Sequence, residues 1–110
     1  MAAVDGSGLK ANPTLPEIQS FVARKMQERG FDNQSVQDHL LLLMEEVGEL
    51  AKSVRPLHGM KLAEDSKAQN TEHEAADVFW MLVCVCNNLG IDLEQAVREK
   101  EAINAKRVWR

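Results

Sequence analysis

Acidic residues stand inside two apolar runs of this chain, and this combination strongly constrains how the chain can fold. The first run, LLLMEEVGELA, holds Glu45, Glu46 and Glu49, and the second, EHEAADVFWML, holds Glu74 and Asp77. A spacing of i, i+3 places two carboxylates on one side of a helix, about 5–6 Å apart at Cβ. A lone ionised carboxylate is costly to bury. The sequence therefore predicts a compensating positive charge between the clusters, most simply a hard divalent cation.

Length and charge limit the classes of protein to which the chain can belong. Its 110 residues predict one domain, which at this size is often completed by oligomerisation. The formal net charge of −4 argues against a nucleic-acid groove that neutralises phosphates. We expect no signal peptide, no membrane span and no bridge between Cys84 and Cys86, whose i, i+2 spacing points them apart. These features predict a reducing, cytoplasmic setting.

Hydrophobic periodicity and capping residues predict an all-α protein. Residues 1–13 are small and polar and are expected to form a flexible arm, followed by one helical domain over 14–110. Helices are predicted over about 15–29, from a cap at residues 32–35 to 54, over 71–89, and over 93–108. The connection 55–70 is long for a helix–helix loop, so it is either a solvated loop or a cover for a site.

Placing residues at about 100° per step puts each acid pair at the margin of an apolar stripe. The two stripes are Leu43, Val47, Leu50 and Val54, and Ala75, Val78, Phe79, Leu82 and Cys86. Glu46 and Glu49 lie beside the first stripe, whereas Glu45 turns further out. Glu74 and Asp77 lie beside the second. Antiparallel packing of the two helices would therefore bring four carboxylates together.

Two cations and an amide share the inward side of the last predicted helix. Lys100, Asn104 and Arg107 fall within one narrow stripe if that helix runs over 93–108. Lys and Arg side chains match phosphate oxygens in charge and hydrogen bonding. A polyphosphate bound to the predicted metal site would explain why they face inward.

Each motif also has a simpler interpretation. The first acid cluster can be an ordinary solvated face, and Glu74 can be only the capping-box partner of Thr71. The cations can be last-turn residues that suit the helix dipole. The occurrence of E-E-x-x-E, E-x-x-D and K-x-x-x-N-x-x-R in this order favours a site over these separate explanations.

This constellation resembles the MazG-like nucleotide pyrophosphohydrolases of the all-α NTP pyrophosphatase superfamily. The family motif E-E-x-x-E followed by E-x-x-D appears here as EEVGE and EAAD. The surrounding LLLMEEVGELAKSV and ADVFWMLVCVCNNLGIDLEQAV are also similar to the family, so the likeness covers about residues 15–108. It implies a four-helix bundle-like protomer that oligomerises, as a homodimer or a dimer of dimers.

The resemblance also implies roles for individual residues. It matches the family's Mg²⁺ ligands, for which Mn²⁺ is a possible substitute ion, to Glu46, Glu49, Glu74 and Asp77. Glu45 matches a more variable position, an outer ligand or a helper in activating water, and the proton acceptor is Glu45, Glu46 or Glu49. Contacts to the phosphates are implied for Lys100, Asn104 and Arg107, with Asn88 as a further contact to the substrate.

The activity that the resemblance implies is Mg²⁺-dependent hydrolysis of a nucleoside triphosphate to the monophosphate and pyrophosphate, usually to clear non-standard or excess nucleotides. Two departures bear on substrate choice: His73 stands where many relatives carry another acid, and aromatic residues that could stack a base are scarce. Two alternatives remain open. One is a helical module that binds a metal or nucleotide without turnover, and the other is a structural helical dimer with solvated acids.

Overall fold

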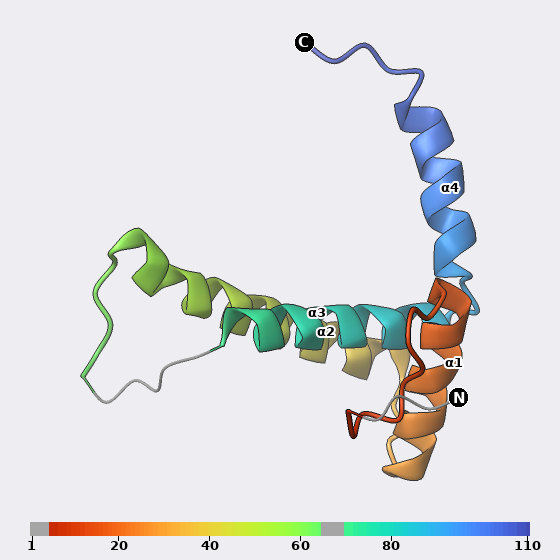
Figure 1. Ribbon diagram of the computed structural model, residues 1–110, viewed down its shortest axis with the longest axis horizontal. Helices are drawn as coiled ribbons and strands as arrows, with labels where there is room; N and C mark the ends of the chain where they lie inside the picture. The colour runs from red at the N-terminus through yellow and green to blue at the C-terminus, as the bar shows by residue number, and fades with distance from the viewer. Residues whose placement is uncertain (1–4, 65–69) are drawn as a thin grey trace. The chain divides into compact units, whose positions relative to one another are not determined.

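Four α-helices and one short 3-10 helix make up the structure, a computed structural model that describes residues 5–64 and 70–110 (Figure 1). They are α1 (Leu15–Glu28), α2 (Val36–Val54), η1 (Arg55–His58), α3 (Thr71–Asn88) and α4 (Leu93–Asn104). The described residues contain no strand, so the predicted all-α class is confirmed. All four predicted helices are present; the first and third end one residue before the predicted end, and the fourth ends at Asn104.

Reciprocal capping boxes fix where the first two helices begin. Thr14 Oγ1 accepts from Glu17 N–H at 3.3 Å, and Glu17 Oε1 accepts from Thr14 N–H at 2.9 Å. Ser35 and Asp38 make the same exchange at the start of α2, at 3.1 and 2.9 Å. Each box therefore satisfies backbone N–H groups that the end of a helix leaves unpaired.

The capping box predicted for the third helix is wrong. Asn70 caps α3 instead, because its Oδ1 accepts from His73 N–H at 3.1 Å and its backbone O accepts from Glu74 N–H at 3.0 Å. Thr71 is already inside the helix, and its Oγ1 donates to Ser53 O over a long 3.5 Å. The asparagine side chain thus leaves the carboxylate of Glu74 available for another role.

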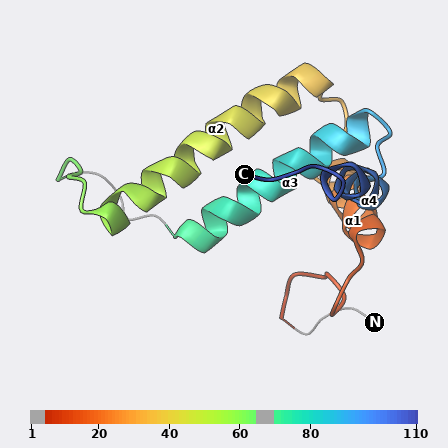
Figure 2. The same ribbon diagram turned by 90° about the horizontal axis from the view of Figure 1, so that it is seen from above.

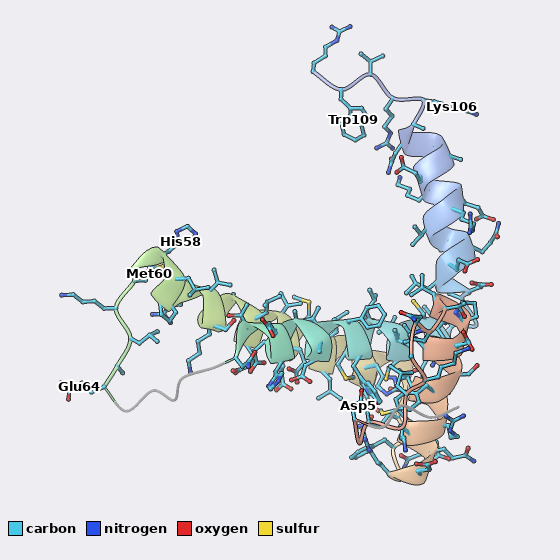
Figure 3. All side chains as sticks on the ribbon, viewed as in Figure 1. Asp5, His58, Met60, Glu64, Lys106 and Trp109 are labelled. Carbon is cyan, nitrogen blue, oxygen red and sulfur yellow. The ribbon has the colours of Figure 1, made fainter. Side chains whose placement is uncertain are left out.

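The fourth helix ends at Asn104, before the predicted end at residue 108. Lys106 N–H donates to Ile103 O and Arg107 N–H donates to Asn104 O, each at 3.1 Å, so the chain tightens into turns. The Trp109 indole N–H, on the tail labelled in Figure 3, donates to Asn104 O at 3.3 Å. Arg107 therefore does not share a helical stripe with Lys100 and Asn104, as the sequence predicted.

The chain divides into two compact units. We call the first the acid unit; it spans Gln34–Val85 and holds α2, η1 and most of α3. We call the second the corner unit; it consists of the chain up to Asn33 together with Cys86–Arg110, and holds α1, the end of α3 and α4. Within the acid unit, α2 and α3 run antiparallel side by side (Figure 2). The Thr71–Ser53 contact joins the beginning of α3 to the end of α2, so this pairing places the predicted acid clusters on facing helices.

Burial departs from the predicted stripes. The buried residues of the acid unit are His39, Ser53 and Val83–Val85, and those of the corner unit are Phe21, Val22 and Cys86. Val47, predicted in the first stripe, is 41% exposed, and Phe79 of the second stripe is 38% exposed. In the single chain, a pair of helices covers only part of each apolar face.

The two cysteines behave as small buried hydrophobes. Both are free and buried, which confirms that Cys84 and Cys86 do not bridge. Burial raises the pKa of the Cys84 thiol to about 11 and also raises the pKa of the Cys86 thiol. Both thiols are therefore protonated at neutral pH and poor nucleophiles.

The arm and the long connection are partly described. Lys10 Nζ lies 2.6 Å from Glu17 Oε2, which ties the end of the arm to α1. The flexibility predicted for 1–13 stays a prediction, and its residues 1–4 lie outside the described chain, as do 65–69 of the 55–70 connection. Among the described helices, none alone is long and apolar enough to cross a membrane; α3 and α4 meet that test only when taken together.

The anchor at Glu17 makes the stability of α1 depend on pH. Hydrogen bonds from Lys10, and then from the backbone and side chain of Thr14, lower the pKa of Glu17 from 4.5 to about 2. Because the folded chain binds this proton less tightly than the unfolded chain, the stabilisation is full above pH 4.5 and is lost as pH falls towards 2. We expect Glu17→Gln to flatten the decline of Tm over that range, measured by circular dichroism.

Glu28→Gln is the matched control, because Glu28 is an acid on the same helix that caps nothing. Its Tm should decline with acid as the native protein does. Parallel curves for the native protein and Glu17→Gln would mean that the capping box and the Lys10 ion pair do not stabilise α1.

Candidate metal and nucleotide site

Three carboxylates meet between α2 and α3. One oxygen from each of Glu46, Glu74 and Asp77 lies within 4.8 Å of the others. Glu46 comes from the middle of α2, whereas Glu74 and Asp77 come from the first two turns of α3, spaced i, i+3 as predicted. Antiparallel packing places the beginning of α3 against the second half of α2, and this is how residues distant in sequence share one site.

Electrostatics single out Glu46 as the centre of this cluster. Burial raises the pKa of the Glu46 carboxyl, and the negative charges of Asp77, Glu74, Glu49 and Glu45 raise it further, in that order. At 4.8 Å, two unit charges repel by about 1 kcal/mol even in the dielectric of water. The cluster is therefore unfavourable when fully ionised, and both a proton and a cation relieve it.

The donor set fits a hard divalent cation. All three groups offer carboxylate oxygens, the ligands that Mg²⁺ and Mn²⁺ prefer, and neither histidine nor cysteine joins the cluster. Because the three oxygens already lie within 4.8 Å of one another, side-chain rotations could bring all three onto one ion.

The structure brings together three of the four predicted ligands. Glu49 is exposed and lies outside the group of oxygens within 4.8 Å, although its charge contributes to the raised pKa of Glu46. Glu45 is also exposed and contributes least of the four neighbouring acids, in keeping with its predicted outward turn. Direct ligation by Glu49 stays a prediction.

The residues predicted to contact phosphates belong to the corner unit. Lys100 and Asn104 line an open hollow of about 300 Å³ on α4, together with Ala96, Val97 and Glu101. Asn104 Oδ1 is shielded from solvent and has no hydrogen-bond partner among the described residues. Arg107 lies in the turn beyond α4, and Asn88 is the exposed last residue of α3.

Sequence reasoning missed one residue that shapes the site. Asn70 caps α3 immediately before the acid-bearing turn, and its backbone O accepts from the N–H of Glu74. The signal was present in the sequence, because Asn is among the most favoured N-cap residues. The sequence prediction assigned the cap to Thr71 instead, because T-x-x-E also fits a capping box.

The fold and the cluster define a class: an all-α protein with an acidic, oxygen-only candidate metal site between antiparallel helices. Residues 34–108 match the MazG nucleotide pyrophosphohydrolase domain. The chain belongs to this family, and as such is a hydrolase that acts on nucleotide anhydrides.

Individual relatives agree with this assignment. The chain is 36% identical to the uncharacterised protein YpjD of Bacillus subtilis in an alignment of 89 residues that covers 78% of each protein. The crystal structure of YpjD superimposes with a TM-score of 0.76 at 32% identity, covering 90% of this chain and 100% of that one.

Two further structures share the fold. One is a cyanophage S-2L MazG-like pyrophosphohydrolase, whose structure contains dGDP and three catalytic Mn²⁺ ions per active site. It matches this chain with a TM-score of 0.69 at 26% identity, over 92% of this chain and 87% of the cyanophage protein. A Bacillus-conserved MazG protein, a nucleotide pyrophosphohydrolase, has a TM-score of 0.68 at 26% identity, covering 92% and 97%.

The raised pKa of Glu46 predicts that Glu46→Gln stabilises the metal-free protein but weakens the stabilisation that Mn²⁺ gives. The folded chain binds the Glu46 proton more tightly than the unfolded chain, so metal-free stability falls as pH rises from 4.5 through the raised pKa. Glu46→Gln should raise the metal-free Tm at pH 7 and abolish that fall. It should also remove most of the Tm increase caused by Mn²⁺, because an ion at about 100 times its Kd stabilises the native state by about 2.7 kcal/mol.

Glu72→Gln is the matched control, because Glu72 is an exposed acid of the same first turn of α3 outside the cluster. It should keep both the pH dependence and the Mn²⁺ response of the native protein. An Mn²⁺ response that Glu46→Gln leaves intact would place ion binding elsewhere.

Proposed function

We propose that this protein is a Mg²⁺-dependent nucleoside triphosphate pyrophosphohydrolase that converts a (d)NTP to the (d)NMP and pyrophosphate. The observation that supports this most strongly is the convergence of Glu46, Glu74 and Asp77 on facing helices of a MazG-family chain. The Mn²⁺ ions and dGDP in the active site of the cyanophage relative support the same metal class and substrate class. The physiological role is the clearance of non-standard or excess nucleotides from the cytoplasm.

The carboxylates have two tasks in this proposal. Glu46, Glu49, Glu74 and Asp77 hold Mg²⁺, which Mn²⁺ can replace, because hard oxygen ligands match both ions. When bound, such an ion supplies positive charge beside the phosphate oxygens and an ordered place for water. A carboxylate that the ion does not fully engage, Glu45, Glu46 or Glu49, accepts the proton of the attacking water.

The corner unit supplies groups that recognise phosphate. Lys100 and Arg107 donate hydrogen bonds to phosphate oxygens and neutralise the charge that develops on the leaving pyrophosphate. The side-chain amide of Asn104, on the same hollow as Lys100, orients the phosphate chain. Asn88, at the end of α3, makes a further contact to the substrate.

Product analysis tests the proposed reaction. With Mg²⁺ and a panel of standard and modified triphosphates, the protein should release pyrophosphate rather than orthophosphate. Asp77→Asn and Glu49→Gln should each lower kcat by at least about a hundredfold, because each removes a charged ligand that the reaction needs. Their circular dichroism spectra should stay helical.

Glu64→Gln, on the connection after η1, is a control that should retain full activity. Tight binding of a triphosphate with no product would favour a binding module without turnover. Full activity in both Asp77→Asn and Glu49→Gln would mean that the site is wrongly placed.

We also propose that the protein is at least a homodimer, joined through α2 in each copy. Large apolar side chains of α2 are exposed in the single chain, with Leu41 69% exposed and Met44 65%. Leu40 and Val47 extend this surface along the helix. Contiguous apolar surface of this kind on a soluble helix marks an interface, and a second copy supplies an identical face.

Charge substitutions on α2 test the dimer. Leu41→Asp with Met44→Asp should convert the protein to a monomer in analytical ultracentrifugation, because two buried carboxylates would face their copies across the interface. Leu57→Asp is the control: Leu57 is 74% exposed but lies on η1, away from this surface. A native protein that sediments as a monomer at every concentration would contradict the proposal.

A further inference from the structure

We propose that Gln19 is a positioning residue for nucleotide binding, because its side-chain amide fixes the beginning of the helix that carries Lys100 and Asn104. The inference rests on the proposed function, since α4 matters to activity only if the chain binds a triphosphate. Gln19 is neither a member of the acid cluster nor one of the residues that line the hollow on α4. Its effect must therefore pass through the backbone of the corner unit.

Three consecutive parts of the corner unit meet at this one amide. Gln19 Nε2 donates to Ile91 O at 2.8 Å and to Asn87 Oδ1 at 3.0 Å, and Gln19 Oε1 accepts from Leu93 N–H at 2.9 Å. In return, Asn87 Nδ2 donates to the backbone O of Gln19 at 3.0 Å. A single side chain of α1 thus joins the last turn of α3, the connection and the first residue of α4.

Backbone groups decide which way the Gln19 amide points. Leu93 N–H can only donate and Ile91 O can only accept, so the Gln19 oxygen must face Leu93 and the nitrogen must face Ile91. The same logic then sets the amide of Asn87, whose oxygen receives the second N–H of Gln19. Only glutamine offers one acceptor and two donors at this reach.

These contacts complete the beginning of α4. A helix N-terminus leaves its first N–H groups without partners inside the helix. Asp92 Oδ1 accepts from Gln95 N–H at 3.1 Å, and Gln19 Oε1 takes the N–H of Leu93. The connection turns through Gly90 at φ +66°, a backbone conformation that few other residues adopt. Gln19 therefore fixes the point at which α4 leaves this turn.

The length of α4 amplifies any error at its beginning. Lys100 and Asn104 lie about 10 and 16 Å along the helix from Leu93, at 1.5 Å per residue. A change of about 10° in the direction of the helix would move Asn104 by about 3 Å, roughly the length of a hydrogen bond. A side chain that binds phosphate would then lose its contact while the helix itself stayed intact.

Steady-state kinetics of Gln19→Met test the inference. Methionine keeps the length and the flexible shape of the side chain but removes all three of its hydrogen bonds. We expect KM for the triphosphate to rise about tenfold, kcat to stay within about threefold, and calorimetric Mn²⁺ affinity to be unchanged. Gln27→Met, at an exposed position of the same helix, should change none of these values.

A second variant guards against a folding defect. Asn87→Ala removes two of the four hydrogen bonds and leaves those to Ile91 and Leu93. It should raise KM in the same direction by a smaller factor.

The possible results separate this inference from the proposed function. An unchanged KM in Gln19→Met, with pyrophosphate release intact, overturns the inference and leaves the function standing. Parallel loss of kcat, Mn²⁺ affinity and helicity would assign Gln19 a structural role only, which also overturns it. A native protein that releases no pyrophosphate contradicts the proposed function itself, and the inference falls with it.

Discussion

The acid unit holds three carboxylates close together, those of Glu46, Glu74 and Asp77. The carboxyl of Glu46 is partly buried and sits beside Glu74 and Asp77, within 4.8 Å at their nearest oxygens. Its raised pKa records both burial and like charge. A folded protein retains such an arrangement when an additional partner, a proton or a cation, makes it favourable. Because the chain belongs to the MazG family, we propose that this partner is a divalent cation.

The helix ends are what make this crowding possible. Asn70 satisfies the first turn of α3, which leaves Glu74 facing α2 instead of its own backbone. The Ser35–Asp38 box fixes the start of α2 in the same way. In the corner unit, Gln19 and Asp92 perform this task for α4. Because residues outside the acid cluster cap these helices, the carboxylates of Glu46, Glu74 and Asp77 are not used as caps.

Local patterns predicted most of the secondary structure and the central part of the site. The i, i+3 spacing of Glu74 and Asp77 placed both on one helix face, and Glu46 was identified by its position beside the apolar stripe of α2. The same spacing also predicted Glu49, which lies outside the group of oxygens within 4.8 Å. The end of α4 was not predictable in this way, since Arg107 and Val108 continue the periodic pattern but the chain turns at Asn104. Gln19 was missed because its partners, Asn87, Ile91 and Leu93, depend on tertiary structure, and no local pattern in α1 points to them.

Anomalous scattering from crystals grown with Mn²⁺ and a non-hydrolysable triphosphate tests the central claim most directly. The account predicts a strong anomalous peak at the manganese absorption edge within about 2.2 Å of carboxylate oxygens of Glu46, Glu74 and Asp77, with the triphosphate adjoining it. A peak bound to other residues would contradict the account. So would a well-ordered triphosphate with no anomalous peak at these three carboxylates.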